Sequence, residues 1–224
     1  MNLYNFFIKN GIFIILFCSY FSIYNPLLAF YVYLKTFSAN YYICFKHLYP
    51  KPELYKWKHL IRLTDTGHYA NFLFYFNPTF LPICHNVQFI ISFGYYFTKF
   101  FFNMKDTDDR DNANLISSLQ SIHCNINHSI PYLILLYSNC HGIYEFNTKS
   151  LLLSYGWCYC WLIFIYIPWR YYTGDCVYSI LDPKHTSIKL QFIILLLLHF
   201  IIFIGNTFGM ITNNIINTNL LGLE

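Results

Sequence analysis

The sequence predicts an all-α protein, an integral membrane bundle of about six transmembrane helices, and three observations support this fold class. Charged residues make up only 11% of the 224 residues, whereas soluble domains carry about 25%. Hydrophobic residues make up 56% of the chain and aromatic residues 22%. Five long windows contain no Asp, Glu, Lys or Arg: 10–34, 66–98, 112–144, 150–169 and 190–223.

Each window is long enough for a membrane-spanning helix, which needs about 20 mostly apolar residues. The window 66–98 is interrupted by Asn77-Pro78 and Pro82. Proline breaks a helix because it lacks a backbone donor, so this window predicts two short spans joined by a sharp reversal. The chain is thus expected to form a single transmembrane domain, residues 1–224, with six spans: 11–34, 63–80, 83–103, 127–146, 150–169 and 190–211.

The basic residues predict the orientation of these spans. Of the 14 Lys and Arg residues, all except Lys9 and Lys149 fall in the first, third and fifth loops between the spans. Cytoplasmic loops carry an excess of Lys and Arg, so these loops are predicted to face the cytoplasm and both termini the other side. A further span hidden at 41–45 would reverse this orientation. The net charge of +4 is too small and too dispersed for a nucleic-acid interface.

Polar residues at membrane depth are costly and often functional, and one group opens the second predicted span. Thr64, Gly67, His68 and Asn71 recur at i, i+3, i+4 and i+7, a spacing that places them on one helix face. This face is expected to turn toward the bundle interior. Interhelical hydrogen bonding, with close approach at the glycine, is the structural explanation; catalysis is the functional one.

A second polar group opens the fourth predicted span, where Ser129 is expected to cap the helix and Pro131 to lie in its first turn. His128 would then lie at the membrane surface or just inside it, and histidine is well suited to act as a general base near neutral pH. The second and fourth spans begin on the same membrane face. Thr64 and His128 are therefore a candidate hydroxyl–imidazole pair for acyl transfer, with Thr66 and Ser129 as rival hydroxyls.

Two metal hypotheses compete with this pair. His123, Cys124, His128, Cys140 and His141 suggest zinc, but His123 and His128 are not spaced i, i+4 as in the usual helical metal pair, and Cys140 and His141 lie about three turns farther on. The aspartate-rich stretch 105–111 suggests calcium, but it lacks the central Gly and distal Glu of an EF-hand loop. No metal and no cofactor is expected.

From about residue 57 to residue 214, the chain resembles a known family of small six-span proteins: the androgen-induced membrane proteins, which include the androgen-dependent regulator of tissue factor pathway inhibitor. The matching motifs are, in order, Trp57-Lys58, Leu63-Thr64-x-x-Gly67, Pro82 with Val87 and the run 93–102, Asn127-His128-Ser129-Ile130-Pro131-Tyr132-Leu133, Tyr172-Thr173-Gly174 with Val177-Tyr178 and Leu181, and Gly205 with Asn213-Asn214.

The resemblance implies an atypical threonine hydrolase that cleaves fatty-acid esters of hydroxy fatty acids, with Thr64 as nucleophile and His128 as base. A gapless match from Trp57 would instead place Ile61 at the nucleophile position, so the register of this motif stays open. The expected partners are membrane lipids and a lipid-ester substrate, in an endomembrane or the plasma membrane. The alternatives are a non-enzymatic membrane scaffold or lipid-binding protein, and a small transporter.

Overall fold

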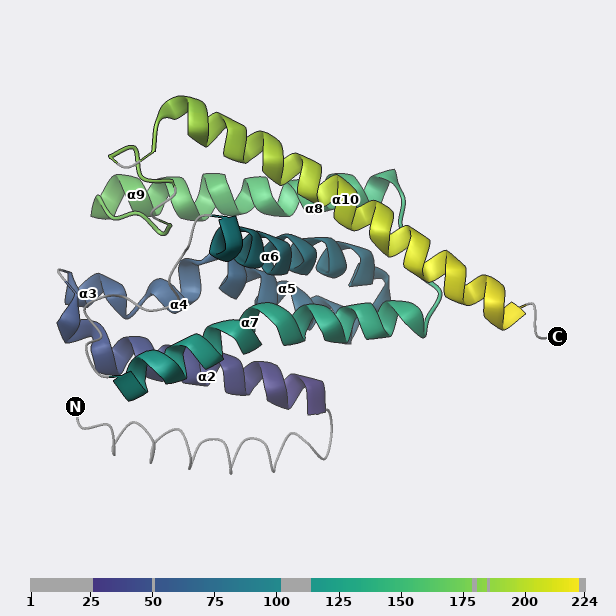
Figure 1. Cartoon of the computed structure of the whole chain (residues 1–224), viewed down its shortest axis with the longest axis horizontal. Coiled ribbons are helices and arrows are strands. Elements are labelled where there is room, and N and C mark those ends of the chain that lie inside the picture. The colour runs from purple at the N-terminus through teal and green to yellow at the C-terminus, as the bar shows by residue number, and fades with distance from the viewer. Residues whose placement is uncertain (1–25, 50, 102–113, 179–180, 185, 222–224) are drawn as a thin grey trace. The chain divides into compact units, whose positions relative to one another are not determined.

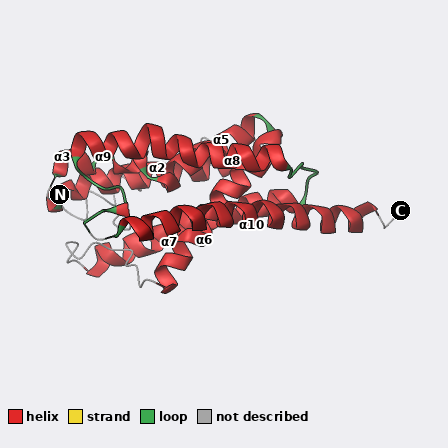
Figure 2. Ribbon diagram, turned by 90° about the horizontal axis from the view of Figure 1, so that it is seen from above, coloured by secondary structure: helices red, strands yellow, loops and turns green. Residues whose placement is uncertain are grey.

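The computed structural model describes residues 26–49, 51–101, 114–178, 181–184 and 186–221, and none of these residues lies in a strand (Figure 2). The all-α prediction is therefore confirmed for the described chain. Two helical stretches within it, Thr148–Thr173 and Ile188–Ile215, are long and apolar enough to cross a membrane. The plan of six spans goes further than these two helices and stays a prediction.

The helices follow one another in the order labelled in Figure 1. Their bounds are α2 (Pro26–Phe45), η1 (Lys46–Leu48), α3 (Pro52–Tyr55), α4 (Lys58–Ile61), α5 (Leu63–Phe76), η2 (Pro78–Phe80), α6 (Leu81–Phe101), α7 (Asn114–Cys140), α8 (Thr148–Trp161), η3 (Leu162–Tyr166), α9 (Ile167–Thr173) and α10 (Ile188–Leu221). The chain forms two compact units. The first unit takes its described residues from 1–65 and 105–127, and the second takes them from 66–104 and 128–224.

The predicted reversal after the second span is confirmed by the turn between α5 and α6. The Asn77 side chain accepts a hydrogen bond from the Thr79 backbone N–H at 3.1 Å, and Pro78 occupies the first position of η2, where a missing donor costs nothing. Helix α6 begins directly afterwards at Leu81. The short helix α5 therefore runs back against α6.

The first predicted span, 11–34, lies outside the described residues up to residue 25, and α2 continues past residue 34 to Phe45. The predicted helix start of the fourth span is wrong. The fourth span was expected to begin at residue 127, but α7 begins at Asn114. Ser129 is therefore no helix cap, and Pro131 lies inside the helix rather than in its first turn.

The first unit has an aromatic core. Phe37, Tyr41, Tyr42, Phe45 and Tyr55 are buried together. Within this core Tyr55 donates a hydrogen bond to the Tyr49 hydroxyl at 2.6 Å. Burial raises the pKa of Tyr55, so its phenol stays protonated and keeps this donor.

The second unit is held by buried amide and hydroxyl groups that link apolar helices. The Asn86 amide on α6 donates to Ser154 Oγ on α8 at 3.0 Å and to Asn206 Oδ1 on α10 at 2.9 Å. Ser150, which also closes a capping box with Asn147 at the start of α8, donates to the same Asn206 oxygen at 3.1 Å. A small apolar cluster of Ile90, Cys158 and Ile202 packs beside this network.

A second amide network joins α7 to α10. The Asn213 amide donates to the backbone carbonyls of Asn139 and Gly142, at 2.8 and 2.7 Å. The Asn139 amide in turn donates to the Gly209 carbonyl at 3.0 Å and to Thr212 Oγ1 at 2.8 Å. Polar side chains inside this unit therefore act as interhelical connections.

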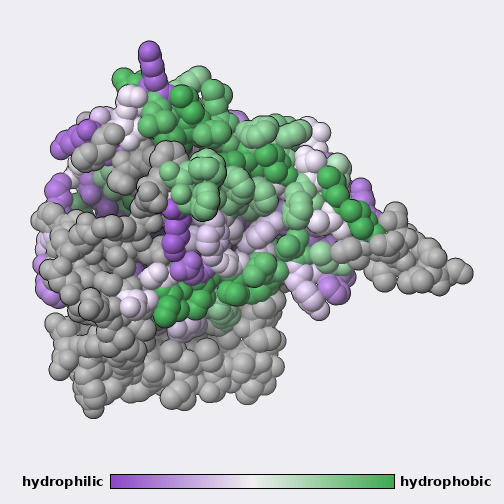
Figure 3. Space-filling view, in the orientation of Figure 1, coloured by the Kyte–Doolittle hydropathy of each residue, from purple (hydrophilic) through white to green (hydrophobic). Residues whose placement is uncertain are grey.

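Large apolar side chains cover the outward face of α10. Ile188, Phe192, Leu196, Phe200 and Phe203 are all exposed, and Figure 3 shows apolar side chains, in green, gathered along this helix. Exposed apolar surface of this extent marks a protein or membrane contact. The composition of α10 and its exposure thus agree with contact to lipid.

Candidate functional site

The polar face of α5 is buried, as the sequence predicts. Thr64, His68 and Asn71 are each less than a tenth exposed. Gly67 allows α6 to approach this face, because a Cβ at residue 67 would collide with the Ile91 side chain and lie 3.2 Å from Val87. Farther along the hairpin, the Cys84 thiol contacts the Ala70 carbonyl at 3.3 Å. The structural explanation of this motif, close helix packing at a glycine, is therefore confirmed for Gly67.

The structure separates the rival nucleophile positions. Ile61 is the last residue of α4, and Arg62 after it has an extended backbone, with φ −67° and ψ 145°. Thr64 lies in the first turn of α5 and is buried, and Thr66 is buried too. A gapless match would therefore place the nucleophile position at Ile61, on a different helix from Gly67. Thr64, in contrast, lies on the same helix and the same face as Gly67.

An ion pair next to Thr64 was not found from the sequence. Asp65 is buried and pairs with Lys35 of α2, and both residues belong to the first unit. A carboxylate at the start of a predicted span, thirty positions from its partner, gives no local sequence signal. Its position at the start of an apolar span was the one indication that this carboxylate needs a partner, because buried charges are nearly always paired.

His128 is held in place by two residues of α6. Its ring lies parallel to the Tyr95 ring, with centroids 3.9 Å apart and an interplanar angle of 8°. The Ser92 hydroxyl donates to the backbone carbonyl of His128. His128 is half-buried. Stacking therefore fixes its ring while part of the residue stays exposed.

Pro131 removes one backbone donor from α7. Inside a helix, proline supplies no N–H to the carbonyl four residues earlier, and in α7 that carbonyl belongs to Asn127. The Ser92 hydroxyl binds the next carbonyl, that of His128, and so ties this residue to α6.

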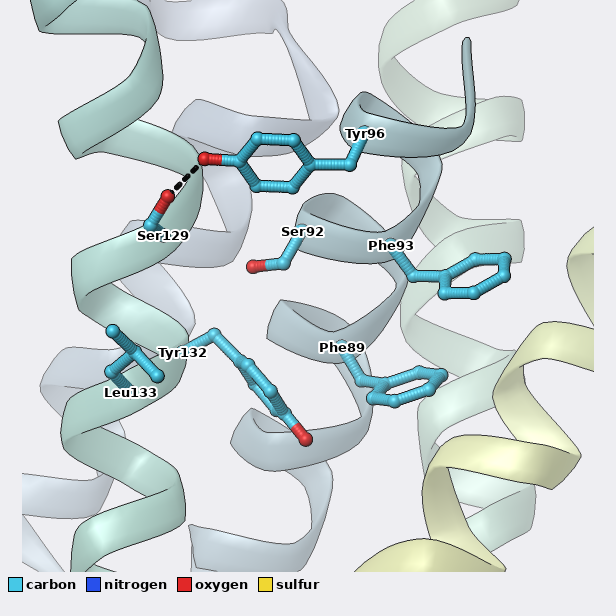
Figure 4. Close-up of a pocket in the computed structure, with 7 residues that line it drawn as sticks. All are labelled: Phe89, Ser92, Phe93, Tyr96, Ser129, Tyr132 and Leu133. Carbon is cyan, nitrogen blue, oxygen red and sulfur yellow. Dashed lines mark hydrogen bonds between the residues drawn. The ribbon is translucent and has the colours of Figure 1, made fainter. Parts of the chain in front are cut away.

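An open apolar cavity of about 290 Å³ lies between α6 and the second half of α7; its lining includes Ser129, which follows His128 in the chain, but not His128 itself. Figure 4 shows the residues that line it: Phe89, Ser92, Phe93 and Tyr96 from α6, and Ser129, Tyr132 and Leu133 from α7. The Tyr96 and Ser129 hydroxyls hydrogen-bond to each other across one end. At the other end, the Tyr132 hydroxyl lies 3.4 Å from Nε2 of His85. The cavity walls are therefore aromatic and aliphatic, with hydroxyls at the margins.

The two predicted catalytic residues belong to different units. Thr64 is in the first unit and His128 in the second. Each is described by its own surroundings, and their pairing stays a prediction.

His123, the first histidine of the zinc hypothesis, makes other contacts. His123 lies against the Phe37 ring, with centroids 4.4 Å apart, and its Nε2 is 2.9 Å from the Ser38 hydroxyl. In the part of the chain that the structure describes, no group of three or more His, Cys, Asp or Glu residues could hold a metal ion. The aspartate-rich stretch 105–111 lies outside the described residues.

Comparisons with protein-family models, with curated proteins and with solved structures gave no match to this chain.

Proposed function

We propose that this chain is an integral membrane hydrolase of lipid esters, with Thr64 as nucleophile and His128 as general base and without a cofactor. One observation carries the proposal: the His128 imidazole is stacked against Tyr95 of α6, the helix that also lines an apolar cavity of about 290 Å³. A positioned base next to a site for an acyl chain is what ester hydrolysis within a membrane needs. The motif resemblance at Leu63-Thr64-x-x-Gly67 and at His128 supplies the reaction class.

The membrane setting is part of the proposal. The six charge-poor spans and the basic first, third and fifth loops describe a multi-pass protein of an endomembrane or the plasma membrane. The exposed apolar face of α10 supports lipid contact. An acyl chain would enter the cavity laterally from the bilayer.

The proposed reaction has two steps. Thr64 Oγ attacks the ester carbonyl carbon while His128 accepts the hydroxyl proton, and the alcohol leaves with that proton. Water then attacks the acyl-threonine, again giving its proton to His128, which returns it to Thr64 as the acid departs. The net change is ester plus water to acid plus alcohol.

A fluorophosphonate probe tests this proposal, because it labels activated serine and threonine nucleophiles. Membranes carrying the wild type, Thr64→Ala and His128→Ala are compared, and both substitutions are expected to abolish labelling. Thr66→Ala and Ser129→Ala serve as matched hydroxyl controls and are expected to keep it. Labelling that survived both Thr64→Ala and His128→Ala would refute the assignment, and loss in Thr66→Ala alone would move the nucleophile by two residues.

A non-enzymatic lipid-binding or scaffold protein is the second candidate, and a specific observation favours it. Three buried asparagines of the second unit, Asn86, Asn139 and Asn213, serve as interhelical hydrogen-bond donors. The polar face of α5 would then be one more connection of this kind. In that case the purified wild type would bind a fluorescent fatty acid but would not react with the probe.

A further inference from the structure

The segment 46–62, which joins α2 to α5, is rich in basic residues, and the structure describes all of it except residue 50. It contains one acidic residue, Glu53, and five residues that are Lys or Arg: Lys46, Lys51, Lys56, Lys58 and Arg62. The segment therefore has a net charge of +4, which equals the net charge of the whole chain. The Asp65 carboxylate just after the segment is buried and paired with Lys35, so that pair adds no net charge.

Tyr42 of α2 holds this segment in place. The Tyr55 ring of α3 is buried and meets the Tyr42 ring edge-on, with centroids 4.8 Å apart. The Arg62 guanidinium carbon lies over the same Tyr42 ring, 5.1 Å from its centroid. One ring of α2 thus fixes both the middle and the end of the segment, while Lys46 and Lys51 are exposed. A surface that is held in this way loses little conformational entropy when it binds a partner.

Two apolar side chains of the segment are exposed beside the lysines. Trp57 and Leu60 are 48% and 40% exposed, and they are three residues apart, which places them on one face of a helical turn. The Lys56 ammonium lies over the Trp57 ring, 5.2 Å from its centroid. Lysines together with exposed Trp and Leu side chains are typical of segments that lie in the membrane–water interface. The segment therefore fits a surface that is anionic outside and apolar beneath.

The position of the segment in the chain favours a lipid bilayer as that surface. In the proposed six-span plan, residues 46–62 belong to the first loop, between two spans and on the cytoplasmic face. The cytoplasmic leaflet carries anionic lipids, and a cluster of about four to eight Lys or Arg residues beside a span is attracted to it. A soluble acidic partner would match the charge, but it would leave the exposure of Trp57 and Leu60 unexplained.

We propose that the segment 46–62 binds the anionic headgroups of membrane lipids. The lysine ammonium groups contact the lipid phosphates, and Trp57 and Leu60 lie among the headgroups. This inference rests on the membrane setting of the proposed function and is independent of its hydrolase chemistry. It assigns to the first unit a lipid partner of defined charge, separate from any substrate.

Two lipids that differ only in their headgroup test the inference. Phosphatidylglycerol is anionic and phosphatidylcholine is zwitterionic, and both carry the same fluorescent acyl chain. The full-length protein in an uncharged detergent is titrated into each lipid, and the fluorescence anisotropy gives the two dissociation constants. The wild type is expected to bind phosphatidylglycerol about 30-fold more tightly, because each basic residue near an anionic headgroup contributes about five-fold. Raising NaCl from about 0.05 M to about 0.5 M is expected to remove most of this preference.

The paired substitution Lys46→Gln with Lys51→Gln removes two exposed charges and is expected to lower the preference about tenfold or more. Lys184→Gln with Lys189→Gln is the matched control, because it removes two exposed charges outside the segment, and it is expected to keep the preference. Lys46→Arg with Lys51→Arg keeps both charges and is also expected to keep the preference, which separates the effect of charge from any effect on folding.

The outcomes separate this inference from the proposed hydrolase. A wild type that binds the two lipids equally would overturn the inference and leave the hydrolase untouched. A preference that survives in full in Lys46→Gln with Lys51→Gln, or that falls equally in the control, would refute it as well, because binding would then not depend on this segment. Displacement of the labelled lipid by an equal concentration of glycerol phosphate would assign the surface to soluble phosphates instead of a bilayer. An intact preference without labelling by the fluorophosphonate probe would support the lipid surface and refute the hydrolase alone.

Discussion

The two units of this chain are stabilised by different chemistry. The first unit buries stacked aromatic rings and one ion pair, Lys35 with Asp65, and it exposes basic residues such as Lys46 and Lys51. The second unit buries asparagine and serine networks and exposes long apolar faces, above all on α10. The first unit therefore has an aromatic core and basic residues at its surface, whereas the second unit has polar networks in its interior and apolar side chains at its surface.

The second unit has features by which helices associate in lipid. Helices there gain little from burying apolar side chains against each other, so small residues and interhelical hydrogen bonds become the connections. Gly67 and Gly205 lie at close contacts with side chains of α6, and the asparagine networks supply the hydrogen bonds. The predictions below test the difference between the two units, beginning with the largest expected effect.

Asp65→Ala is expected to destabilise the protein most. It leaves the Lys35 ammonium buried without its carboxylate, and breaking a buried ion pair in this way costs about 3–5 kcal/mol. The free energy of unfolding in detergent, measured by SDS titration, checks this value. The double substitution Lys35→Met with Asp65→Leu is the control, because it removes both charges and is expected to recover most of the loss. A single variant as stable as the wild type would remove the ion pair from the account of the first unit.

Asn213→Leu is expected to cost about 2–3 kcal/mol, since the carbonyls of Asn139 and Gly142 would lose their donor. The next residue provides a matched control. Asn214 is exposed on the same turn of α10, and Asn214→Leu is expected to change the free energy of unfolding by less than about 0.5 kcal/mol. Equal effects of the two substitutions would show that amide networks do not distinguish the second unit.

The sequence predicts the helical class, the reversal at Asn77-Pro78 and the buried face of α5, because each depends on local spacing. It does not predict the start of α7, since the segment 114–126 is polar and Pro131 suggested a later beginning. It also does not predict the pairs Lys35–Asp65 and Asn139–Asn213, because their members are far apart in the chain and become neighbours only through packing. Asn86, Asn139 and Asn213 form the interhelical networks, and no local pattern in the sequence marks them for this role.

The candidate site likewise has a part that the sequence predicts and a part that depends on helix packing. The motif around His128 identifies the residue, but the stacking on Tyr95 and the bond from Ser92 depend on how α6 packs against α7. Gln88 belongs to no motif, and its burial without a hydrogen-bond partner among the described residues is visible only in a structure.

Tyr55→Phe is expected to have a smaller effect, about 1 kcal/mol. The substitution keeps the ring in the aromatic core and removes only the hydrogen bond from Tyr55 to the Tyr49 hydroxyl, 2.6 Å long. Thermal melting of the purified protein measures it. Tyr171→Phe, at an exposed position of α9, is the control and should melt with the wild type. A loss several times larger would mean that the hydroxyl network, rather than ring stacking, holds the first unit.

The smallest expected effect is the contribution of His59, in the first unit, to the pH dependence of stability. Burial lowers the pKa of His59, which stacks on the Tyr42 ring with centroids 6.1 Å apart; the Asp65 carboxylate opposes this shift and Lys35 adds to it. The folded protein therefore keeps this imidazole neutral at a pH where the unfolded chain binds a proton. The contribution of His59 to stability is full above the ordinary histidine pKa, about 6.5, and falls as the pH drops below it.

Melting temperatures at pH 7.5 and 5.5 measure this dependence, and His59→Phe is expected to reduce the difference between them. His47→Phe is the matched control at an exposed position of the same unit and should leave the difference unchanged. The amide networks of the second unit contain no group that titrates in this range, so they add no slope of their own. A wild-type slope that persists in full in His59→Phe would assign the pH dependence to other groups and weaken the contrast between the two units.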